Sequence, residues 1–309
     1  MESSTSAAAH AAAAPGRWGE ADQLVRTVVA WFDANSRPLP WRLDPSPWGV
    51  LVSEVMLQQT PVNRVEPVWT AWMARWPTPP DLAAEQPAAA IRAWGRLGYP
   101  RRALRLHGAA VAITNDHSGR VPSNYEALLA LPGVGDYTAA AVLSFAYNGR
   151  ATVLDVNVRR LLARAISGQA STPAHVTAAE RRLADALIPL DAPARWAAAS
   201  MELGQVICTA RNPDCPHCPL SDRCAWLAAG QPGADERTTR PQAFAGTDRQ
   251  VRGLIIDRLR TSSATSADLQ DLWPTDPLQL SRALDSLVAD GLVDPIAENT
   301  FTLPGDHQA

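Results

Sequence analysis

Apolar residues recur every three or four positions through most of the first 229 residues, which is the spacing of amphipathic helices. Alternation with a period of two, typical of strands, is nearly absent before the last part of the chain. The helical patterns cover residues 24–32, 62–76, 103–113, 158–165, 175–188 and 193–203. The pattern therefore predicts an all-α fold up to about residue 229.

Changes in composition divide the rest of the chain. Residues 1–16 are rich in Ala and contain no Lys or Arg, so they predict a disordered tail rather than a signal peptide. Residues 230–247 are rich in Gly, Pro and charged residues, which indicates a linker. Residues 248–305 show three short helical patterns and then an extended pair, the pattern of a small winged-helix-like module. No apolar run approaches the length of a membrane span, and we expect a cytoplasmic protein.

One carboxylate lies in a segment that is otherwise almost entirely apolar. Eight of the ten residues 48–57 are apolar or Gly, and the other two are Ser53 and Glu54. A Glu in such a helix can face solvent. It can also be buried, and burial then raises its pKa so that it stays partly protonated and can donate a proton. The pattern alone leaves both interpretations of Glu54 open.

The charged residues are unevenly distributed. All 28 basic residues are Arg, so a Schiff-base, P-loop or pyridoxal lysine is excluded. The net charge is −3, yet residues 92–164 carry ten Arg against four acidic residues, a net of +6. Residues 230–309 carry seven Arg against twelve acidic residues, a net of −5. A basic region in a near-neutral chain is typical of proteins that bind an anionic partner.

All four cysteines lie within seventeen residues, with the spacing C-x6-C-x2-C-x5-C. A set of disulfides is not expected in a cytosolic chain that has no other cysteine. Four thiolates can hold a structural zinc ion, which usually uses two separated C-x2-C pairs. A single C-x2-C between two longer gaps is more typical of a compact loop around an iron–sulfur cluster. The spacing therefore favours a cluster and keeps zinc as the alternative.

The segment LPGVGDYTAAAVLSFA predicts a tight turn between two helices, the second beginning near Asp136. Ser123 and Glu126 have the spacing of a capping box at the start of the first helix. Gly133 and Gly135 would let the backbone of the turn approach a phosphate closely. Any tight helix–helix turn can carry this motif, so its position near the basic region is what points to DNA.

A second isolated acid, Asp155, lies in the segment ATVLDVNVRRLLAR. As the N-cap of the following helix it would accept hydrogen bonds from backbone N–H groups. Such bonds predict a low pKa and an ionised carboxylate, which suits stabilising a developing cation. The structural and the chemical interpretation of Asp155 are compatible.

The chain resembles the A/G-specific adenine DNA glycosylases of the endonuclease III superfamily in motifs that follow one another in the family's order. They are PWR at 40–42, SEVMLQQT at 53–60, RLGYPRRALRLH at 96–107, LPGVGDYT at 131–138, VLDVNVRR at 153–160 and the cysteine loop. The resemblance covers about residues 17–229. It implies a helix-hairpin-helix fold with a six-helix barrel at 40–148 and an iron–sulfur cluster domain formed by 17–39 and 149–229.

The resemblance also implies roles for individual residues. Glu54 would protonate N7 of an extruded adenine, and Asp155 would stabilise or transiently trap the oxocarbenium-like sugar. Tyr137 and Asn157 would position Asp155 and the leaving base. DNA contacts are implied for Leu57, Gln58, Gln59, Tyr99, Gly133 and Gly135. Ligation of a [4Fe–4S] cluster is implied for Cys208, Cys215, Cys218 and Cys224.

The implied function is excision of adenine mispaired with 8-oxoguanine or guanine in base excision repair. Relatives that cleave the DNA backbone carry a catalytic lysine in the hairpin where this chain has Tyr137, which implies a glycosylase without lyase activity. We expect a monomer that binds duplex DNA at the bacterial nucleoid. The alternatives are removal of thymine or uracil opposite G, and a non-enzymatic iron–sulfur regulator. A proton donor at Glu54 favours a purine, because pyrimidines lack N7.

Two features depart from the family pattern. The family commonly has LGYY, whereas Pro100 follows Tyr99 here, so a second aromatic contact with DNA is not expected. Many members also carry a C-terminal Nudix-like domain that reads 8-oxoguanine. The 62 residues after the linker here are too few for that fold, and their helical pattern differs from it.

Overall fold

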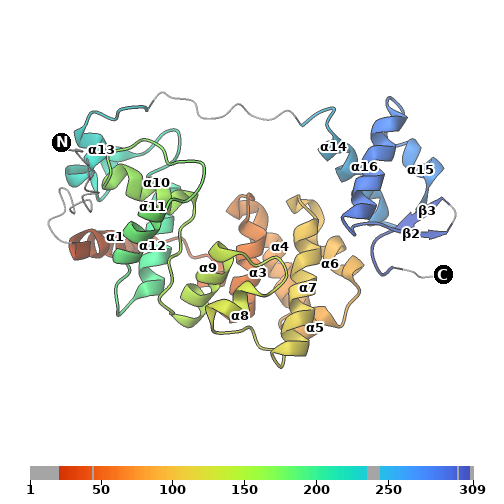
Figure 1. The fold of residues 1–309 in the computed structure, drawn as a ribbon, viewed down its shortest axis with the longest axis horizontal. Helices are drawn as coiled ribbons and strands as arrows, with labels where there is room; N and C mark the ends of the chain where they lie inside the picture. Colours follow the sequence, from red (N-terminus) through yellow and green to blue (C-terminus); the bar gives the residue numbers. More distant parts are fainter. Residues whose placement is uncertain (1–20, 44, 235–243, 298, 307–309) are drawn as a thin grey trace, which may run out of the picture. The chain divides into compact units, whose positions relative to one another are not determined.

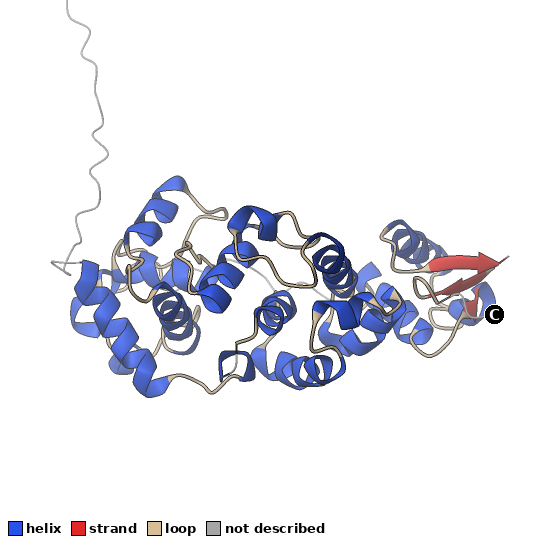
Figure 2. Ribbon diagram, turned by 90° about the horizontal axis from the view of Figure 1, so that it is seen from below, coloured by secondary structure: helices blue, strands red, loops and turns tan. Residues whose placement is uncertain are grey.

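The computed structural model describes residues 21–43, 45–234, 244–297 and 299–306. The predicted tail at 1–16 and half of the predicted linker, residues 235–243, lie outside the described residues. The chain divides into two compact units, unit 1 within residues 1–37 and 148–237 and unit 2 within 38–147 and 238–309. Among the described residues, helices dominate both units and strands occur only near the C-terminus (Figures 1 and 2).

Unit 1 joins an early helix to later ones. Its elements are α1 (Ala21–Asn35), α10 (Val156–Ala165), α11 (Ala178–Ala186), α12 (Pro193–Val206), the 3-10 turns η3 (Cys215–His217) and η4 (Ser221–Arg223), and α13 (Ala225–Ala228). Helix α12 packs against both α1 and α10, and α10 also contacts α13. The core of the unit is built from apolar side chains of these helices, among them Leu24, Val28, Leu161 and Leu203.

Unit 2 begins with a helical part, residues 38–147, here called the barrel segment. Its elements are α2 (Pro40–Leu43), α3 (Pro47–Leu57), α4 (Val62–Arg75), α5 (Pro79–Ala83), α6 (Pro87–Trp94), η2 (Gly95–Leu97), α7 (Arg101–Asp116), α8 (Tyr125–Leu129) and α9 (Asp136–Tyr147). Helix α3 contacts α4, α7 and α9, and α5 packs on α7. The barrel segment therefore surrounds α3 with helices on several sides.

The central position of α3 follows from its sequence. Ser46 is the N-cap and accepts a hydrogen bond from the backbone N–H of Gly49 at 3.0 Å, and Pro47 occupies the first turn, where no N–H is needed. Nine of the eleven residues of α3 are buried, including Glu54. A helix that is apolar on all sides is stable only inside a core, so the apolar run places α3 there.

The N-cap of the first hairpin helix is Asn124, one residue after the predicted cap Ser123. Asn124 is the N-cap of α8, and its side chain accepts a hydrogen bond from the N–H of Ala127 at 2.8 Å. The capping box predicted for Ser123 and Glu126 is therefore wrong. Asn and Ser are about equally good N-caps, so sequence preference alone does not decide between neighbours. The second helix, α9, begins at Asp136 as expected.

The C-terminal module consists of α14 (Asp248–Leu259), β1 (Ala264–Thr265), α15 (Ser266–Gln270), α16 (Pro277–Ala289), β2 (Asp294–Ala297) and β3 (Thr300–Thr302). The antiparallel sheet has the order β1-β3-β2, with Ala264 opposite Phe301 and Asp294 opposite Thr302. The three helices and the pair β2 and β3 agree with the predicted elements, whereas the short strand β1, between α14 and α15, was not predicted.

The module belongs to unit 2 and shares its core. One continuous cluster of buried apolar side chains includes Leu51 and Ile91 of the barrel segment together with Val251 and Leu303 of the module. The prediction had treated the module as a separate domain. None of the helices in the described parts of the chain is both long and apolar enough to span a membrane.

Candidate active site

Glu54 is buried in the barrel segment and hydrogen-bonded to a phenol. Its side chain lies on α3, and the residue is 6% exposed. The hydroxyl of Tyr137, in the first turn of α9, donates a hydrogen bond to Oε2 of Glu54 at 2.9 Å. The solvent-facing interpretation of Glu54 is therefore excluded. The carboxyl is therefore held inside the core, with one oxygen fixed by the phenol.

A buried guanidinium supports the end of α3. The Nη1 atom of Arg102 donates to the carbonyl oxygens of Val55 and Met56 at 3.0 Å each and to that of Gln58 at 2.6 Å. Its Nη2 atom donates to Thr60 Oγ1 and to the carbonyl oxygen of Gly98, both at 3.0 Å. Burial lowers the pKa of Arg102 to about 10, which still leaves the group charged at neutral pH. The arginine thus satisfies helix-end carbonyls that would otherwise lack donors.

Sequence reasoning did not identify Arg102. It appears as one of several arginines in a basic region, and that pattern indicates a solvent-facing charge. The available signal was its place on α7, where it falls on the apolar face with Ala103 and Leu106. A charged residue at a core position of a helix calls for a partner, and here the partners are carbonyl groups.

Arg102 joins two turns that carry residues predicted to contact DNA. Gln59 lies in the turn after α3 with φ of 54°, and Tyr99 lies in the turn before α7 with φ of 49°. Both are exposed, Tyr99 at 48%. A positive φ is uncommon for residues other than Gly, and it is retained only where the surroundings impose it. The structure therefore presents Gln59 and Tyr99 on two turns fixed by one buried group.

The other two predicted contact residues of this region are less exposed. Leu57 is partly buried and packs against the core cluster. Gln58 is also partly buried, and its Nε2 lies 3.5 Å from the hydroxyl oxygen of Thr138 in α9. Pro100 is the residue directly before α7, where its fixed φ suits a helix start.

The hairpin turn contains one glycine that is closely packed and one that has no close neighbours. Gly133 has φ of 79°, and a Cβ atom built on it would lie 2.7 Å from Cβ of Arg105, so no larger residue fits without a shift. A Cβ atom on Gly135 would meet nothing within 4 Å. The carbonyl oxygen of Gly135 accepts the first hydrogen bond of α9, from the N–H of Ala139. Gly133 thus lets the turn pack on α7, and Gly135 leaves the backbone at the N-terminus of α9 accessible.

Asp155 is the N-cap of α10 in unit 1, as the sequence predicts. Its Oδ1 atom accepts hydrogen bonds from the N–H groups of Asn157 at 2.9 Å and Val158 at 2.7 Å. Its Oδ2 atom accepts one from Nδ2 of Asn157 at 2.6 Å. The expectation of a low pKa is wrong, however. Burial raises the pKa of Asp155 and outweighs the opposing effect of these bonds and of Arg160. The bonds therefore fix the orientation of the carboxyl more than they favour its ionised form.

A chain of hydrogen bonds leads from Asp155 to the cysteine loop. Nη2 of Arg160 donates to Oδ1 of Asn157 at 2.9 Å and to the carbonyl oxygen of Gly204 at 2.6 Å. Its Nε donates to the carbonyl oxygen of Cys208 at 2.7 Å. A Cβ atom on Gly204 would lie 2.6 Å from the backbone oxygen of Asn157, so α12 passes closely beneath the start of α10. The position of the Asp155 carboxyl is therefore tied to the first residue of the cysteine loop.

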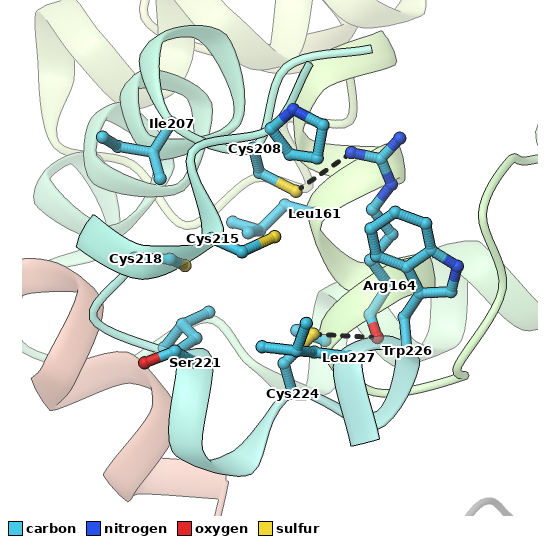
Figure 3. Close-up of a pocket in the computed structure, with 13 residues that line it drawn as sticks. Leu161, Arg164, Ile207, Cys208, Cys215, Cys218, Ser221, Cys224, Trp226 and Leu227 are labelled. Carbon is cyan, nitrogen blue, oxygen red and sulfur yellow. Dashed lines mark hydrogen bonds between the residues drawn. The ribbon is translucent and has the colours of Figure 1, made fainter. Parts of the chain in front are cut away.

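The four cysteines surround one space in unit 1. Cys208, Cys215, Cys218 and Cys224 are free thiols that line the same pocket, and their sulfur atoms face it (Figure 3). Nη1 of Arg164 lies 3.6 Å from Sγ of Cys208, and its guanidinium stacks on Trp226 with 4.5 Å to the ring centroid.

This set of sulfur donors fits an iron–sulfur cluster. Partial burial raises the pKa of the Cys218 thiol to about 12, and a bound metal would favour its thiolate form. Within the described residues, no three Cys, His, Asp or Glu side chains lie close enough together to hold one metal ion. The four cysteine sulfur atoms face one pocket, and four cysteine thiolates are the ligand set of a [4Fe–4S] cluster.

The predicted site residues fall into the two units. In unit 2 the structure brings Glu54 together with Tyr137, and it links the turns of Gln59 and Tyr99 through Arg102. In unit 1 it brings Asp155 together with Asn157. The resemblance had assigned Tyr137 to Asp155 and the base, and its contact with Glu54 is an addition.

Comparison with known proteins agrees with these features. Residues 52–185 match the family model described as HhH-GPD superfamily base excision DNA repair protein, and residues 208–224 match the iron-sulfur binding domain of endonuclease III. The chain is similar to the adenine DNA glycosylase of Mycolicibacterium smegmatis, with 50% identity over 91% of this chain and 96% of the relative. The adenine DNA glycosylase of Rattus norvegicus is 39% identical over 64% of this chain and 40% of its own length.

Solved structures show the same fold. The structure of a thermostable thymine-DNA glycosylase superposes with a TM-score of 0.63 at 28% identity, covering 68% of this chain and 97% of that one. A non-covalent endonuclease III–DNA complex superposes with a TM-score of 0.58 at 22% identity and covers 68% of this chain and 98% of that one. The alignment with the mycobacterial relative leaves out only 9% of this chain and therefore includes part of the C-terminal module.

Proposed function

Because the chain belongs to the adenine DNA glycosylases, we propose that it hydrolyses the N-glycosidic bond of an adenine mispaired with 8-oxoguanine or guanine in duplex DNA. The proposal rests chiefly on one observation, the burial of Glu54 beside the Tyr137 phenol. A carboxyl removed from water can hold a proton and deliver it to a base that has itself been taken out of the helix. The chain contains an iron–sulfur binding domain, and we propose that its four cysteines ligate a [4Fe–4S] cluster.

In the proposed reaction Glu54 donates its proton to N7 of the flipped adenine. The C1′–N9 bond then breaks, and its electron pair leaves with the neutral base. The hydrogen bond from Tyr137 fixes one oxygen of the Glu54 carboxyl, so the proton can be carried at a defined position. Adenine has an N7 atom to accept the proton and thymine and uracil do not, which favours a purine substrate.

Asp155 is proposed to stabilise the positive charge that develops on the sugar. Two backbone N–H groups and the Asn157 amide hold its carboxyl in one orientation, so little reorganisation is needed as the charge forms. A water molecule then adds to C1′, and the proton it releases passes to the Glu54 carboxylate, which restores the acid. Glu54 and Asp155 thus take complementary roles, one as proton donor and the other as anion.

The absence of lysine leads us to propose a glycosylase without lyase activity. A lyase step through a Schiff base needs a neutral side-chain amine, and this chain has none. Tyr137, at the position where related lyases carry lysine, is engaged with Glu54 instead. The cluster supplies no proton or electron to a hydrolysis. When bound, it would cross-link the loop 208–224, whose first residue, Cys208, accepts hydrogen bonds from Arg160 and Arg164.

The proposal is tested with duplexes that each contain one mispair. We expect the full-length protein with its cluster to produce alkali-sensitive sites in A·8-oxoguanine and A·G duplexes and none in a T·G duplex. Strand breaks without alkali would reveal lyase activity. Breaks confined to the T·G duplex would overturn the proposal in favour of thymine excision.

Two variants test the assignment of the residues. Glu54→Gln and Asp155→Asn keep the size of the side chains but remove the proton donor and the anion. Each should lower the single-turnover rate at least about a hundredfold while duplex affinity persists. Full activity of either variant would remove that residue from the mechanism.

A further inference from the structure

The acidity of the C-terminal module at first argues against any contact with DNA. The structure shows that several of its carboxylates are paired with arginines of the barrel segment. Asp257 accepts a hydrogen bond from Arg96 at 2.8 Å, and Asp290 pairs with Arg101 at 3.0 Å. A third pair joins Asp306 to Arg92. Three carboxylates of the module are therefore paired with the barrel segment.

Backbone contacts and the shared core add to these ion pairs. The N–H of Ala88 donates to the carbonyl oxygen of Pro304 at 3.0 Å, and Nε of Arg92 donates to the carbonyl oxygen of Arg260 at 3.0 Å. Exposed ion pairs contribute little singly, but pairs that accompany a continuous apolar core fix an orientation. The module is therefore held against the part of the barrel segment that carries η2 and the Tyr99 turn.

This attachment brings Arg249 of the module into contact with Tyr99, which is predicted to contact DNA. Arg249, in the first turn of α14, directs Nη1 to the hydroxyl oxygen of Tyr99 at 3.3 Å. Its guanidinium lies 5.6 Å from the ring centroid of Phe244, which is 55% exposed. On the barrel side, the Arg102 guanidinium lies 5.7 Å from the ring centroid of Tyr99. Tyr99, Arg249 and Phe244 form an exposed group of two aromatic rings and a cation, here called the shared patch.

Arg249 differs from most arginines of the module. Arg252, Arg260 and Arg282 each pair with an aspartate. Among the described residues Arg249 has no carboxylate partner. In nucleic-acid-binding proteins, an exposed arginine beside aromatic side chains can contact phosphates while the rings stack on bases.

We propose that the C-terminal module completes the DNA-binding surface: Arg249 is a positioning residue that holds the Tyr99 side chain ready for the duplex, and Phe244, at the end of the linker that precedes the module, offers a stacking surface beside it. This inference rests on the proposed function, since it gives the module a role in binding the same DNA substrate. An exposed tyrosine at positive φ loses side-chain freedom when it binds. A hydrogen bond from Arg249 restricts that freedom beforehand, which favours binding.

The test measures binding of the full-length protein to a duplex that resists excision. The adenine opposite 8-oxoguanine carries a 2′-fluorine, which disfavours the sugar cation, and the neighbouring base is 2-aminopurine, whose fluorescence rises when it unstacks. Arg258→Ala is the matched control, because Arg258 lies on the same helix, has the same charge and hydrogen-bonds only Ser262 within the module. We compare it with Arg249→Ala, Tyr99→Phe, Phe244→Ala and the Arg249→Ala/Tyr99→Phe double variant.

We expect Arg249→Ala to raise the dissociation constant by about three- to tenfold and to reduce the 2-aminopurine signal. Arg258→Ala should show only the small, salt-dependent loss due to one charge. Tyr99→Phe removes only the hydroxyl, so it should match Arg249→Ala, and the double variant should be no weaker than either single one. Phe244→Ala should also weaken binding.

Equal effects of Arg249→Ala and Arg258→Ala would overturn the inference, because only charge would then matter. Additive losses in the double variant would overturn the positioning role, because Arg249 would then act independently of Tyr99. In both cases the proposed function stands as long as the wild-type protein excises adenine from the unmodified duplex. Failure of that excision would instead refute the proposed function.

Discussion

Replacing Arg102 with methionine tests whether one buried guanidinium holds the two DNA-facing turns. The side chain keeps a similar length, but the donors to the carbonyl groups of Val55, Met56, Gln58 and Gly98 are lost. Val55 and Met56 are 5% and 0% exposed, so water cannot readily replace the lost donors there. Arg102→Met should therefore destabilise unit 2 and loosen both turns.

The size of the effect follows from two opposing contributions. Leaving a buried carbonyl without a donor costs about 1–3 kcal/mol, which gives about 2–6 kcal/mol for the two buried carbonyls. Burial lowers the pKa of Arg102 to about 10, so burying its charge itself costs free energy that the variant no longer bears. We therefore expect a net loss of about 2–4 kcal/mol. For a unit of this size, that lowers the unfolding midpoint by roughly 4–16 °C.

Thermal unfolding followed by circular dichroism measures this loss, with Arg105→Met as the control. Arg105 lies on the same helix and carries the same charge, but it is exposed. Duplex affinity should also fall in Arg102→Met, while the visible absorbance of the cluster should not change. An unfolding midpoint equal to that of Arg105→Met would refute the reasoning, because the carbonyl bonds would then contribute no net stability.

Three further predictions concern the hairpin, the second carboxylate and the cluster. Gly133→Ala should lower the free energy of unfolding by about 1–3 kcal/mol, because it places a Cβ atom against Arg105 at a residue with positive φ. Gly135→Ala should fold normally and weaken only DNA binding, because a Cβ atom there meets no neighbour. Equal unfolding midpoints of the two variants in thermal melts would contradict this. Burial raises the pKa of Asp155, so its stabilising contribution is present at low pH and lost as pH rises through that pKa. Asp155→Asn should therefore have a higher unfolding midpoint than the wild type at neutral pH, and the difference should disappear at acidic pH. A difference that does not change with pH would show that the ionisation of Asp155 does not affect stability. Cys218→Ser should lose the broad visible absorbance of the cluster and raise protease sensitivity in residues 208–224, and retained absorbance would show that Cys218 is not a ligand.

The sequence predicted the features that depend on local spacing. The apolar run around Glu54 correctly indicated a buried helix, and the spacing of Asp155 before α10 correctly indicated an N-cap. The cysteine spacing and the Gly-rich turn led to the family. These features follow from interactions among residues close together in the chain, so a single sequence displays them.

The features that sequence reasoning missed depend on distant parts of the chain. Arg102 reaches carbonyls more than forty residues away, and nothing in its neighbourhood shows that it is buried. The raised pKa of Asp155 results from burial, which outweighs the N-cap hydrogen bonds that the sequence predicted. The union of the module with the barrel segment likewise rests on pairs such as Arg96–Asp257, which lie 161 positions apart.

The pairing of α1 with α12 has a consequence for synthesis on the ribosome. α1 is made early, but the helix against which it packs ends at Val206, after the whole barrel segment has been made. The helices of the barrel segment can pack against one another before α12, the helix on which α1 packs, has been synthesised. Unit 1, and with it the loop that takes up iron and sulfide, is therefore completed late. Cluster insertion is expected to follow the formation of the barrel segment rather than guide it.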